Sequence, residues 1–573
     1  MQTVAHRAGC VLLAALLVVG AAYADPVRSP SGHSAPNLVN ADAHLQDLCE
    51  ILRAGNSREL LAWVGHHHDW VSGAFLQVHL FPPLEMDRVA SLAIRLYGGK
   101  QTGVGGSRRP VQAWIPLLSI PLLAIPPGVG YIRLPSIPLL HDVPGALASN
   151  ALMAMGASRW HDLGYLGQGI RVGVIDLGYL GYQDLMGSEL PSSIETGSFV
   201  DGQEGLSVDR GTRHGTAVAE IIHDVAPESD LFLARIATTV DLVEAVEWLL
   251  SREVDVICTS LGWFDVSPGD GTGLLADQVN RVRAEGVLWV TSAGDQRQRH
   301  WCGDWENPLS GDYYRFTPYS LMNWLLEEGH YELSPGTRID AYLRWSDWAA
   351  VEEDYDLYLW EYDIEDPVPR AVATSTDAQT GLAGQTPTEA LTYVTHEAGK
   401  LYALSILAHD VSRGVHLELF LDGEPRLETR VASQSLASPA DVEASLGVAA
   451  VSAAFPYGLL ADSSMGPAKG PGGVGAPGIE QPRIAGYGDI ETASMSPLGG
   501  SSAAAPHAAG AAALILSRYP GWGPDEIESL LIERGEPYPG QTGWDPGIGF
   551  GRLYIGDEPA PQPERAYLPM TTR

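Results

Sequence analysis

The chain has few cysteines, few cations and almost no long apolar runs. Four cysteines in 573 residues do not make a disulfide framework. Only 35 Lys and Arg residues face 70 Asp and Glu residues, a formal net charge of -35, which argues against nucleic acid or an anionic membrane surface as a partner. Prolines interrupt residues 115–125, the internal segment nearest to a membrane span. Hydrophobic residues still make up 45% of the chain, enough for two or three folded domains.

The first 24 residues have the pattern of a secretory signal peptide. His6 and Arg7 precede an apolar run over residues 11–19, and Ala22-Tyr23-Ala24 is a small-x-small cleavage pattern. The apolar run is too short to span a bilayer. The sequence therefore predicts export to the extracellular space or the periplasm.

Residues 25–150 predict a small α+β region. Helical periodicity covers residues 45–64, and the pattern then alternates between strands and helices. This mixture is close to a ferredoxin-like unit, with one of its strands not visible in the sequence. The predicted strands are 75–81, 111–115 and 129–134, and the predicted helices between them are 84–96 and 116–124.

Ser502 is a candidate nucleophile at the start of a helix. Small residues surround it in Gly500-Ser501-Ser502-Ala503-Ala504-Ala505-Pro506-His507, so a substrate backbone can approach closely. The N–H groups that open a helix lack internal partners and can receive an oxyanion. We expect Pro506 at the fourth or fifth helical position, where its missing N–H removes no helical hydrogen bond. A serine hydroxyl also needs a histidine base and a carboxylate to orient that base.

Asp176 and His214 are the candidates for those two roles. Asp176 ends the apolar run of residues 170–176, which predicts a buried parallel strand. His214 opens an amphipathic helix, and Gly215 leaves space beside the ring. Strands and helices then alternate as in doubly wound α/β folds, with predicted strands at 231–236, 254–259 and 287–290 and predicted helices at 241–252 and 273–285.

These three segments resemble, in the same order, the Asp, His and Ser motifs of the subtilisin-like serine peptidases (subtilases, peptidase family S8). Leu177 replaces Thr in the Asp motif, and Ser501 and Ala503 replace Thr and Met in the Ser motif. The resemblance implies that Ser502 is the nucleophile, that His214 is the general base and later the general acid, and that Asp176 orients His214.

Two further loops resemble family elements that handle the substrate. Ser260-Leu261-Gly262 resembles the extended segment that pairs with a bound peptide. Ser292-Ala293-Gly294-Asp295 resembles the Ala-Gly-Asn element whose Asn amide donates to the oxyanion. The resemblance implies an oxyanion hole made by the Asp295 side chain and the Ser502 backbone N–H, with Asp in place of Asn as the departure from the family.

More than two hundred residues separate Gly294 from Ser502, which is more than the family's core normally needs and implies an insertion. Residues 305–432 read as all-β, and Asp354-Tyr355-Asp356-Leu357-Tyr358-Leu359 resembles the acidic strand of small jelly-roll domains. Structural Ca²⁺ is a hypothesis here, and a solvated charged face is the alternative. The acidic candidates are Asp347, Glu353, Asp354, Asp356 and Asp363. The predicted strands are 338–345, 356–362, 370–375, 390–396, 400–407 and 415–421.

The sequence thus predicts a doubly wound α/β catalytic domain in two parts, residues 151–304 and 433–557, around an inserted β domain, with a tail over residues 558–573. In the family an N-terminal α+β unit is a propeptide, which implies a zymogen; a permanent accessory domain is the alternative. We expect a secreted serine endopeptidase that acts on proteins or peptides and needs no cofactor for its chemistry. A weak or inactive binding protein on the same fold, or an acid-shifted peptidase, are the alternatives because of Asp295.

Overall fold

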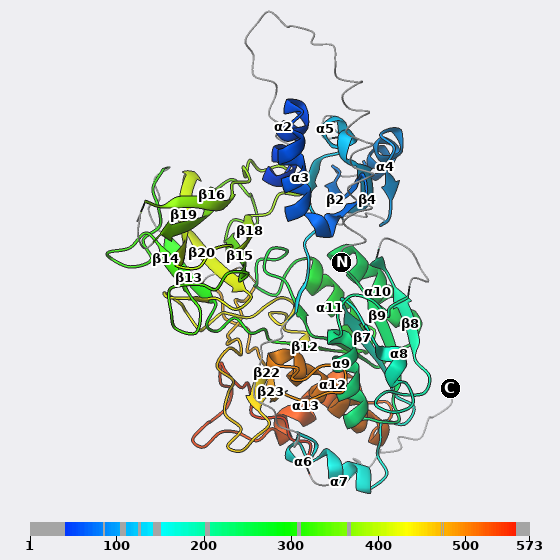
Figure 1. Cartoon of the computed structure of the whole chain (residues 1–573). Coiled ribbons are helices and arrows are strands. Elements are labelled where there is room, and N and C mark those ends of the chain that lie inside the picture. The colour runs from blue at the N-terminus through cyan, green and yellow to red at the C-terminus, as the bar shows by residue number, and fades with distance from the viewer. Residues whose placement is uncertain are drawn as a thin grey trace, which may run out of the picture.

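The computed structural model describes residues 41–83, 86–103, 110–123, 128–140, 151–200, 207–305, 311–363, 368–471, 473 and 475–556. The predicted signal peptide and the predicted tail over residues 558–573 lie outside these residues. Figure 1 shows three bodies: an N-terminal unit, a central α/β domain, and a β-rich body inserted into that domain. No helix in the described part of the chain is long and apolar enough to cross a membrane.

A parallel sheet of seven strands forms the centre of the molecule. Its strand order is β23-β22-β12-β10-β7-β9-β8, and each neighbouring pair is parallel. The inner strands are almost wholly buried because helices cover both of their faces. The strands are β7 (Arg171–Asp176), β8 (Glu195–Ser198), β9 (Asp230–Arg235), β10 (Val256–Thr259), β12 (Leu288–Ser292), β22 (Ser445–Ser452) and β23 (Ile484–Gly488).

Helices pack on both faces of this sheet, which confirms the α/β prediction. One face carries α9 (His214–Val225), α12 (Gly500–Arg518) and α13 (Pro524–Arg534), and their core includes Val174 of β7. The other face carries α10 (Thr239–Ser251) and α11 (Leu274–Ala284), and their core includes Ile175. Consecutive side chains of β7 thus enter opposite cores, as the two-residue period of a strand requires.

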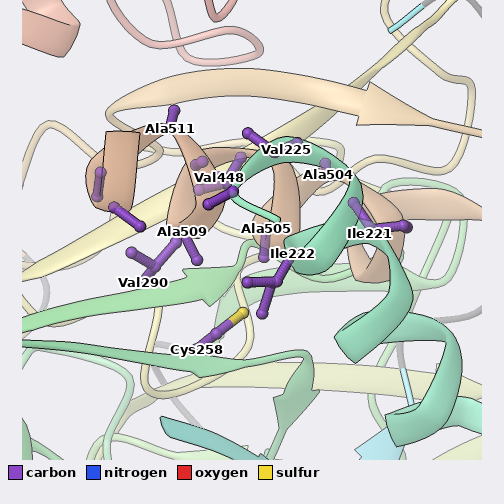
Figure 2. Packing of buried hydrophobic residues seen from close by; sticks show 14 of the residues in the cluster. Ile221, Ile222, Val225, Cys258, Val290, Val448, Ala504, Ala505, Ala509 and Ala511 are labelled. Carbon is purple, nitrogen blue, oxygen red and sulfur yellow. The ribbon is translucent and has the colours of Figure 1, made fainter. Parts of the chain in front are cut away.

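α12 contributes mostly alanine to the core, so the helix approaches its neighbours closely. Figure 2 shows α9 and α12 meeting over the sheet, with Cys258 as a buried thiol among aliphatic side chains. Cys258 is free, as are Cys49 and Cys302. The labelled residues are Ile221, Ile222, Val225, Cys258, Val290, Val448, Ala504, Ala505, Ala509 and Ala511.

The N-terminal unit contains an antiparallel sheet in which β5 and β4 flank β2, and β3 pairs with β4. The chain order β2, α4, β3, β4, α5, β5 with this strand order is the ferredoxin-like arrangement. Its strand β3 (Lys100–Gln101) is the one that the sequence did not reveal, because two residues carry no detectable alternation. The other elements are β1 (Val71–Ser72), β2 (Phe75–Phe81), α4 (Asp87–Leu96), β4 (Val111–Pro116), η2 (Leu117–Ser119), α5 (Ile120–Leu123) and β5 (Tyr131–Arg133).

The helical prediction for residues 45–64 is wrong in one respect, since two helices occupy this stretch. α2 (Ala43–Ala54) ends at Gly55, which has φ 64°, a left-handed conformation that stops a helix. Asn56 then caps α3 (Ser57–His66), which is followed by the single turn η1 (His68–Trp70). Four short elements border the catalytic domain: β6 (Leu139–Leu140), α6 (Ala151–Ala154), α7 (Ala157–Asp162) and α8 (Tyr182–Leu185).

The inserted body consists of two antiparallel sheets that enclose a single core. One sheet has the order β13-β20-β15-β18 and the other β17-β16-β19-β14-β21. Strand β13 begins at His300, so the sandwich starts five residues before the boundary predicted at residue 305. The strands are β13 (His300–Trp305), β14 (Asn323–Leu326), β15 (Arg338–Trp345), β16 (Asp354–Asp363), β17 (Arg370–Ser375), β18 (Thr388–Val394), β19 (Lys400–Asp410), β20 (Val415–Asp422) and β21 (Arg426–Leu427).

Candidate active site

Asp176, His214 and Ser502 meet at one edge of the central sheet, although 326 positions separate the first from the last. Nδ1 of His214 lies 2.7 Å from Oδ2 of Asp176, and Nε2 lies 2.9 Å from Oγ of Ser502. All three residues are at most 1% exposed. One imidazole therefore connects a carboxylate to a hydroxyl, which is the arrangement a serine nucleophile needs.

Backbone contacts fix the carboxylate and the imidazole of this group. Asp176 ends β7, and its Oδ1 accepts from the N–H of Leu177 at 2.8 Å. His214 is the first residue of α9, and its N–H donates to Oγ1 of Thr212 at 3.0 Å. A Cβ on Gly215 would come within 2.7 Å of Cβ of Asp176, so only glycine allows α9 to lie this close to the strand. The glycine thus makes room for the strand rather than for the imidazole ring.

Ser502 is the third residue of α12, in the first turn as predicted, but Pro506 lies further along the helix than we expected. Pro506 is the seventh helical residue, where its missing N–H would leave the carbonyl of Ser502 without its helical partner. Ser260 replaces that partner, because its Oγ donates to the Ser502 carbonyl at 3.0 Å. This hydrogen bond connects the turn that carries Ser502 to the loop that follows β10.

Asp295 lies against the start of α12, next to Ser502 in the fold. Its carboxylate accepts from the N–H of Ser501, at 3.0 Å to Oδ1 and 3.2 Å to Oδ2. A Cβ on Gly500, which has φ +56°, would lie 2.1 Å from Oδ2, so the close approach depends on glycine. Burial raises the pKa of Asp295 to about 8, and the nearby charge of Asp462 adds to this, against the hydrogen bonds from Ser501.

The predicted peptide-binding segment already holds a strand of the same chain. β11 (Leu261–Gly262) pairs antiparallel with β6, Leu261 opposite Leu140 and Gly262 opposite Leu139. Ser260, the residue before β11, accepts from Oγ of Ser502 through its carbonyl at 3.3 Å. The paired strand therefore runs toward the nucleophile. β6 could not be predicted from the sequence, because two leucines between prolines and polar residues have no periodicity to detect.

A cavity of about 930 Å³ adjoins this strand, and all three bodies contribute to its wall. The central domain supplies residues next to the catalytic group, including Leu177, Thr212 and Asp295. The other two bodies supply Trp70, Trp114, Asp340, Tyr342 and Asp422 among others. These last residues could not be predicted from the sequence, because no local pattern relates them to a site in another domain.

The acidic residues proposed for calcium each have protein partners. Arg413 lies 3.2 Å from Glu353 and also contacts Asp347, and Nζ of Lys400 lies 2.6 Å from Asp363. Asp354 faces His409 at 3.7 Å, and Asp356 accepts from the hydroxyl of Tyr358 at 3.2 Å. Among the described residues, no group of three or more His, Cys, Asp or Glu side chains is arranged to hold a metal ion.

The family model of the subtilases matches residues 167–322 and 423–551, which lie on either side of most of the inserted sandwich. The chain belongs to the subtilase family. Minor extracellular protease Vpr of Bacillus subtilis (strain 168) is 31% identical to this subtilase over 169 residues, 26% of this chain and 20% of that protein. Alkaline elastase YaB of Bacillus sp. (strain YaB) is 28% identical over 207 residues, 32% of this chain and 50% of that protein.

The matched stretches therefore span at most half the length of these two relatives. Among solved structures, that of the Clostridium perfringens CspB protease aligns with a TM-score of 0.48 at 16% identity, covering 71% of this subtilase and 98% of that chain.

Proposed function

We propose that this subtilase is a serine endopeptidase that cleaves proteins or peptides through an acyl-enzyme on Ser502. The observation that carries the proposal is the imidazole of His214, held between Asp176 at 2.7 Å and Ser502 at 2.9 Å. The pairing of β11 with β6 supports endopeptidase cleavage, because an internal segment of the protein lies at β11 as a bound peptide substrate would. The net charge of -35 disfavours nucleic acid and anionic membranes as partners.

In the proposed reaction, Oγ of Ser502 forms a bond to the substrate carbonyl carbon while its proton passes to Nε2 of His214. The proton on Nδ1 stays hydrogen-bonded to Asp176, which stabilises the imidazolium. His214 then gives the first proton to the leaving amine as the peptide bond breaks. A water molecule, deprotonated by His214, hydrolyses the acyl-enzyme. The residues themselves supply the nucleophile, the base and the acid, so this route requires no cofactor.

The oxyanion would lie against the N–H of Ser502, since the first N–H groups of α12 have no helical acceptor. The Asp295 carboxyl is the second donor in this proposal when it is protonated. A raised pKa of about 8 means that the donating acid is present below about pH 8 and is lost as the pH rises through that value. His214 must be neutral to act as the base, which limits activity from the acid side. The limit set by Asp295 is thus near pH 8.

The N-terminal unit is a propeptide in this proposal, and the protein is a secreted zymogen. Strand β6, at the end of the proposed propeptide, pairs with β11 beside Ser502, so no other peptide can pair with that edge of β11. Cleavage is expected in residues 141–150, which follow that strand in the sequence. The order of the insert's strands supports a jelly roll, because consecutive strands alternate between the two sheets except at the β16–β17 hairpin. Structural Ca²⁺ in the insert remains a proposal that chelation followed by thermal unfolding would test.

Ser502→Ala tests the proposed function directly. We expect it to abolish cleavage of casein, labelling by a fluorophosphonate, and release of the N-terminal unit when the chain is expressed alone in a peptidase-free host. Ser517→Ala, at the far end of the same helix, is the matched control and should retain all three. Normal labelling of the Ser502→Ala variant would exclude Ser502 as the nucleophile, and normal processing would exclude a self-processing zymogen.

Asp295→Asn tests the second donor. An amide donates at every pH, whereas about one in eleven carboxyls with a pKa of about 8 is protonated at pH 9. The variant should therefore exceed wild type by about tenfold at pH 9 and by less than about threefold at pH 6.5. The measurement is a pair of pH–rate profiles on a peptide substrate between pH 5 and 10. An Asn variant that equals or trails wild type throughout would show that Asp295 does not donate to the oxyanion.

A further inference from the structure

The two leucines of β6 pack against different hydrophobic clusters on opposite sides of the strand. Leu140 packs against the core that contains Leu261 and Ile175 in the central domain. Leu139 packs instead against a cluster of Phe264, Phe420 and Ala437. Alternation along a strand explains the division, because neighbouring side chains of an extended peptide face opposite ways. A peptide bound at β11 in the register of β6 therefore presents the side chain at the Leu139 position to this cluster.

The inserted sandwich supplies half of the wall that Leu139 meets. Tyr342 of β15 and Phe420 of β20 are directly opposite each other in register, and Tyr342 packs against the same cluster as Leu139. Phe264 follows β11 and joins the two domains, because its ring stacks on Phe420 at 4.2 Å and lies 5.8 Å from Tyr342. The catalytic segment and the insert thus share one aromatic cluster.

This aromatic wall is held in place from behind. The guanidinium of Arg344 lies 4.8 Å from the centre of the Phe420 ring and 2.7 Å from Oε2 of Glu418. Phe420 and Phe264 are at most 1% exposed, whereas Tyr342 is only partly buried and lines the cavity beside β6. With Leu139 in place, Tyr342 is therefore the member of this wall that still faces the cavity.

Carboxylates line the cavity together with Tyr342, as does Arg338. Asp340 and Asp422 line the cavity with Tyr342. Burial, and after it the charges of these two residues, raise the pKa of the tyrosine well above its usual value. Asp265 acts on it in the same direction and Arg338 in the opposite one. Nε of Arg338 is already paired with Asp340 at 2.5 Å. An acidic substrate side chain would meet like charges here, and an aliphatic one would meet rings.

We infer that the inserted domain builds a substrate subsite at the position of Leu139, formed by Tyr342, Phe420 and Phe264, which selects an aliphatic side chain and rejects an acidic one. This inference rests on the proposed function and refines it, since the insert then acts as a specificity element within the cleft. Leu139 is the occupant of the subsite in the uncleaved chain.

The test uses internally quenched peptides that span residues 134–150, with Leu, Ala or Asp at the Leu139 position, so that the enzyme chooses its own scissile bond. We expect wild type to prefer Leu over Ala by about tenfold in kcat/KM, the discrimination typical of an apolar pocket, and to disfavour Asp further. Tyr342→Ala should reduce the Leu-to-Ala ratio to below about threefold. Tyr319→Ala, a tyrosine of the same insert that is 97% exposed, should keep the wild-type ratio. A wild-type ratio near one, or an unchanged ratio in Tyr342→Ala, would overturn the inference.

A second measurement separates failure of the subsite from failure of the proposed function. If no peptide is cleaved and Ser502 takes no fluorophosphonate, the peptidase proposal fails while the packing of Leu139 can still be tested. Full-length Ser502→Ala retains β6 covalently, and hydrogen exchange at Leu261 and Gly262 reports its attachment. Leu139→Ala and Tyr342→Ala should each speed this exchange, and the double variant should add little to either. Fully additive effects would show that the two side chains do not share a subsite.

Discussion

The inserted sandwich joins the rest of the molecule through two interfaces of opposite electrostatic character. Toward the central domain, Glu418 is paired with Arg344 at 2.7 Å and contacts Lys469. Although burial alone would raise its pKa, these two cations hold the pKa of Glu418 well below its usual range. The charge at this junction is therefore compensated, and the carboxylate stays ionised.

Toward the N-terminal unit, the same sandwich places carboxylates next to one another. Asp377 accepts from the N–H of Ala43, directly after Asp42, and Glu389 accepts from the N–H of Asp377 at 3.0 Å. Burial raises the pKa of Asp42 to about 6 and of Asp377 to about 7, and it raises that of Glu389 well above its usual value. Among the charges that face this group, Arg133 lowers the pKa of both Asp42 and Asp377, His44 lowers that of Asp377, and Asp47 raises that of Asp42.

The two interfaces are therefore expected to differ in how their stability depends on pH. A compensated ion pair keeps its charge across the physiological range, whereas a group of acids is tolerated only while it retains protons. Raised pKa values mean that the N-terminal interface is most stable at acid pH and weakens as the pH rises from about 4 through about 7. His79 is buried in the N-terminal unit, and burial lowers its pKa to about 3. A buried neutral histidine destabilises the unit as the pH falls below about 6.5, which is the opposite pH dependence. A junction of this kind would suit the release that is proposed for the N-terminal unit.

The largest expected effect comes from breaking the compensated junction with Glu418→Gln. Arg344 and Lys469 would remain buried with no carboxylate between them, and removing one partner of a buried ion pair typically costs about 3–5 kcal/mol. Urea unfolding of the full chain at pH 7 measures the loss. The control is Glu424→Gln, an exposed residue just after the same strand, which should change the free energy of unfolding by less than about 0.5 kcal/mol. Equal effects of the two variants would refute the contrast.

A smaller and pH-dependent effect is expected from Asp377→Asn. The cost of keeping this acid protonated begins near pH 4 and is complete near pH 7, so attachment of the N-terminal unit should strengthen at pH 8 and by clearly less at pH 5. In full-length Ser502→Ala we expect hydrogen exchange at β5 to slow by about tenfold at pH 8, the equivalent of one pKa unit. An equal change at both pH values would mean that Asp377 acts through its shape and not through its charge.

The smallest effect is expected from Thr386→Val, which removes a neutral acceptor from the same interface. Nη1 of Arg133 donates to Oγ1 of Thr386 at 3.3 Å, and such a bond contributes about 0.5–1.5 kcal/mol. Because the threonine does not titrate, the faster exchange at β5 should be the same at pH 5 and pH 8. A strong pH dependence would show instead that Arg133 regulates the acids through this contact.

The sequence alone was sufficient for the elements that carry their own pattern. The apolar run that became β7, the amphipathic α9 and the alanine-rich α12 are all long enough for their hydrophobic patterns to identify them. The family motifs then named Asp176, His214 and Ser502, and the structure brings these three together. Most strands of the insert were also predicted to within a few residues, because each alternates over at least six residues.

Tertiary structure alone decided the features that depend on distant partners. The two-residue strands β3, β6 and β11 exist only because a neighbouring strand supplies their hydrogen bonds. Pro506 is tolerated at the seventh position of α12 because Ser260, 242 positions away from Ser502, satisfies the freed carbonyl. The contact of Tyr342 with the cleft and the acids at the N-terminal interface follow in the same way from the placement of an inserted domain. Local sequence determines which segments are helices and strands, but the environment of each side chain, and hence its pKa and its substrate contacts, is set by residues far away in the chain.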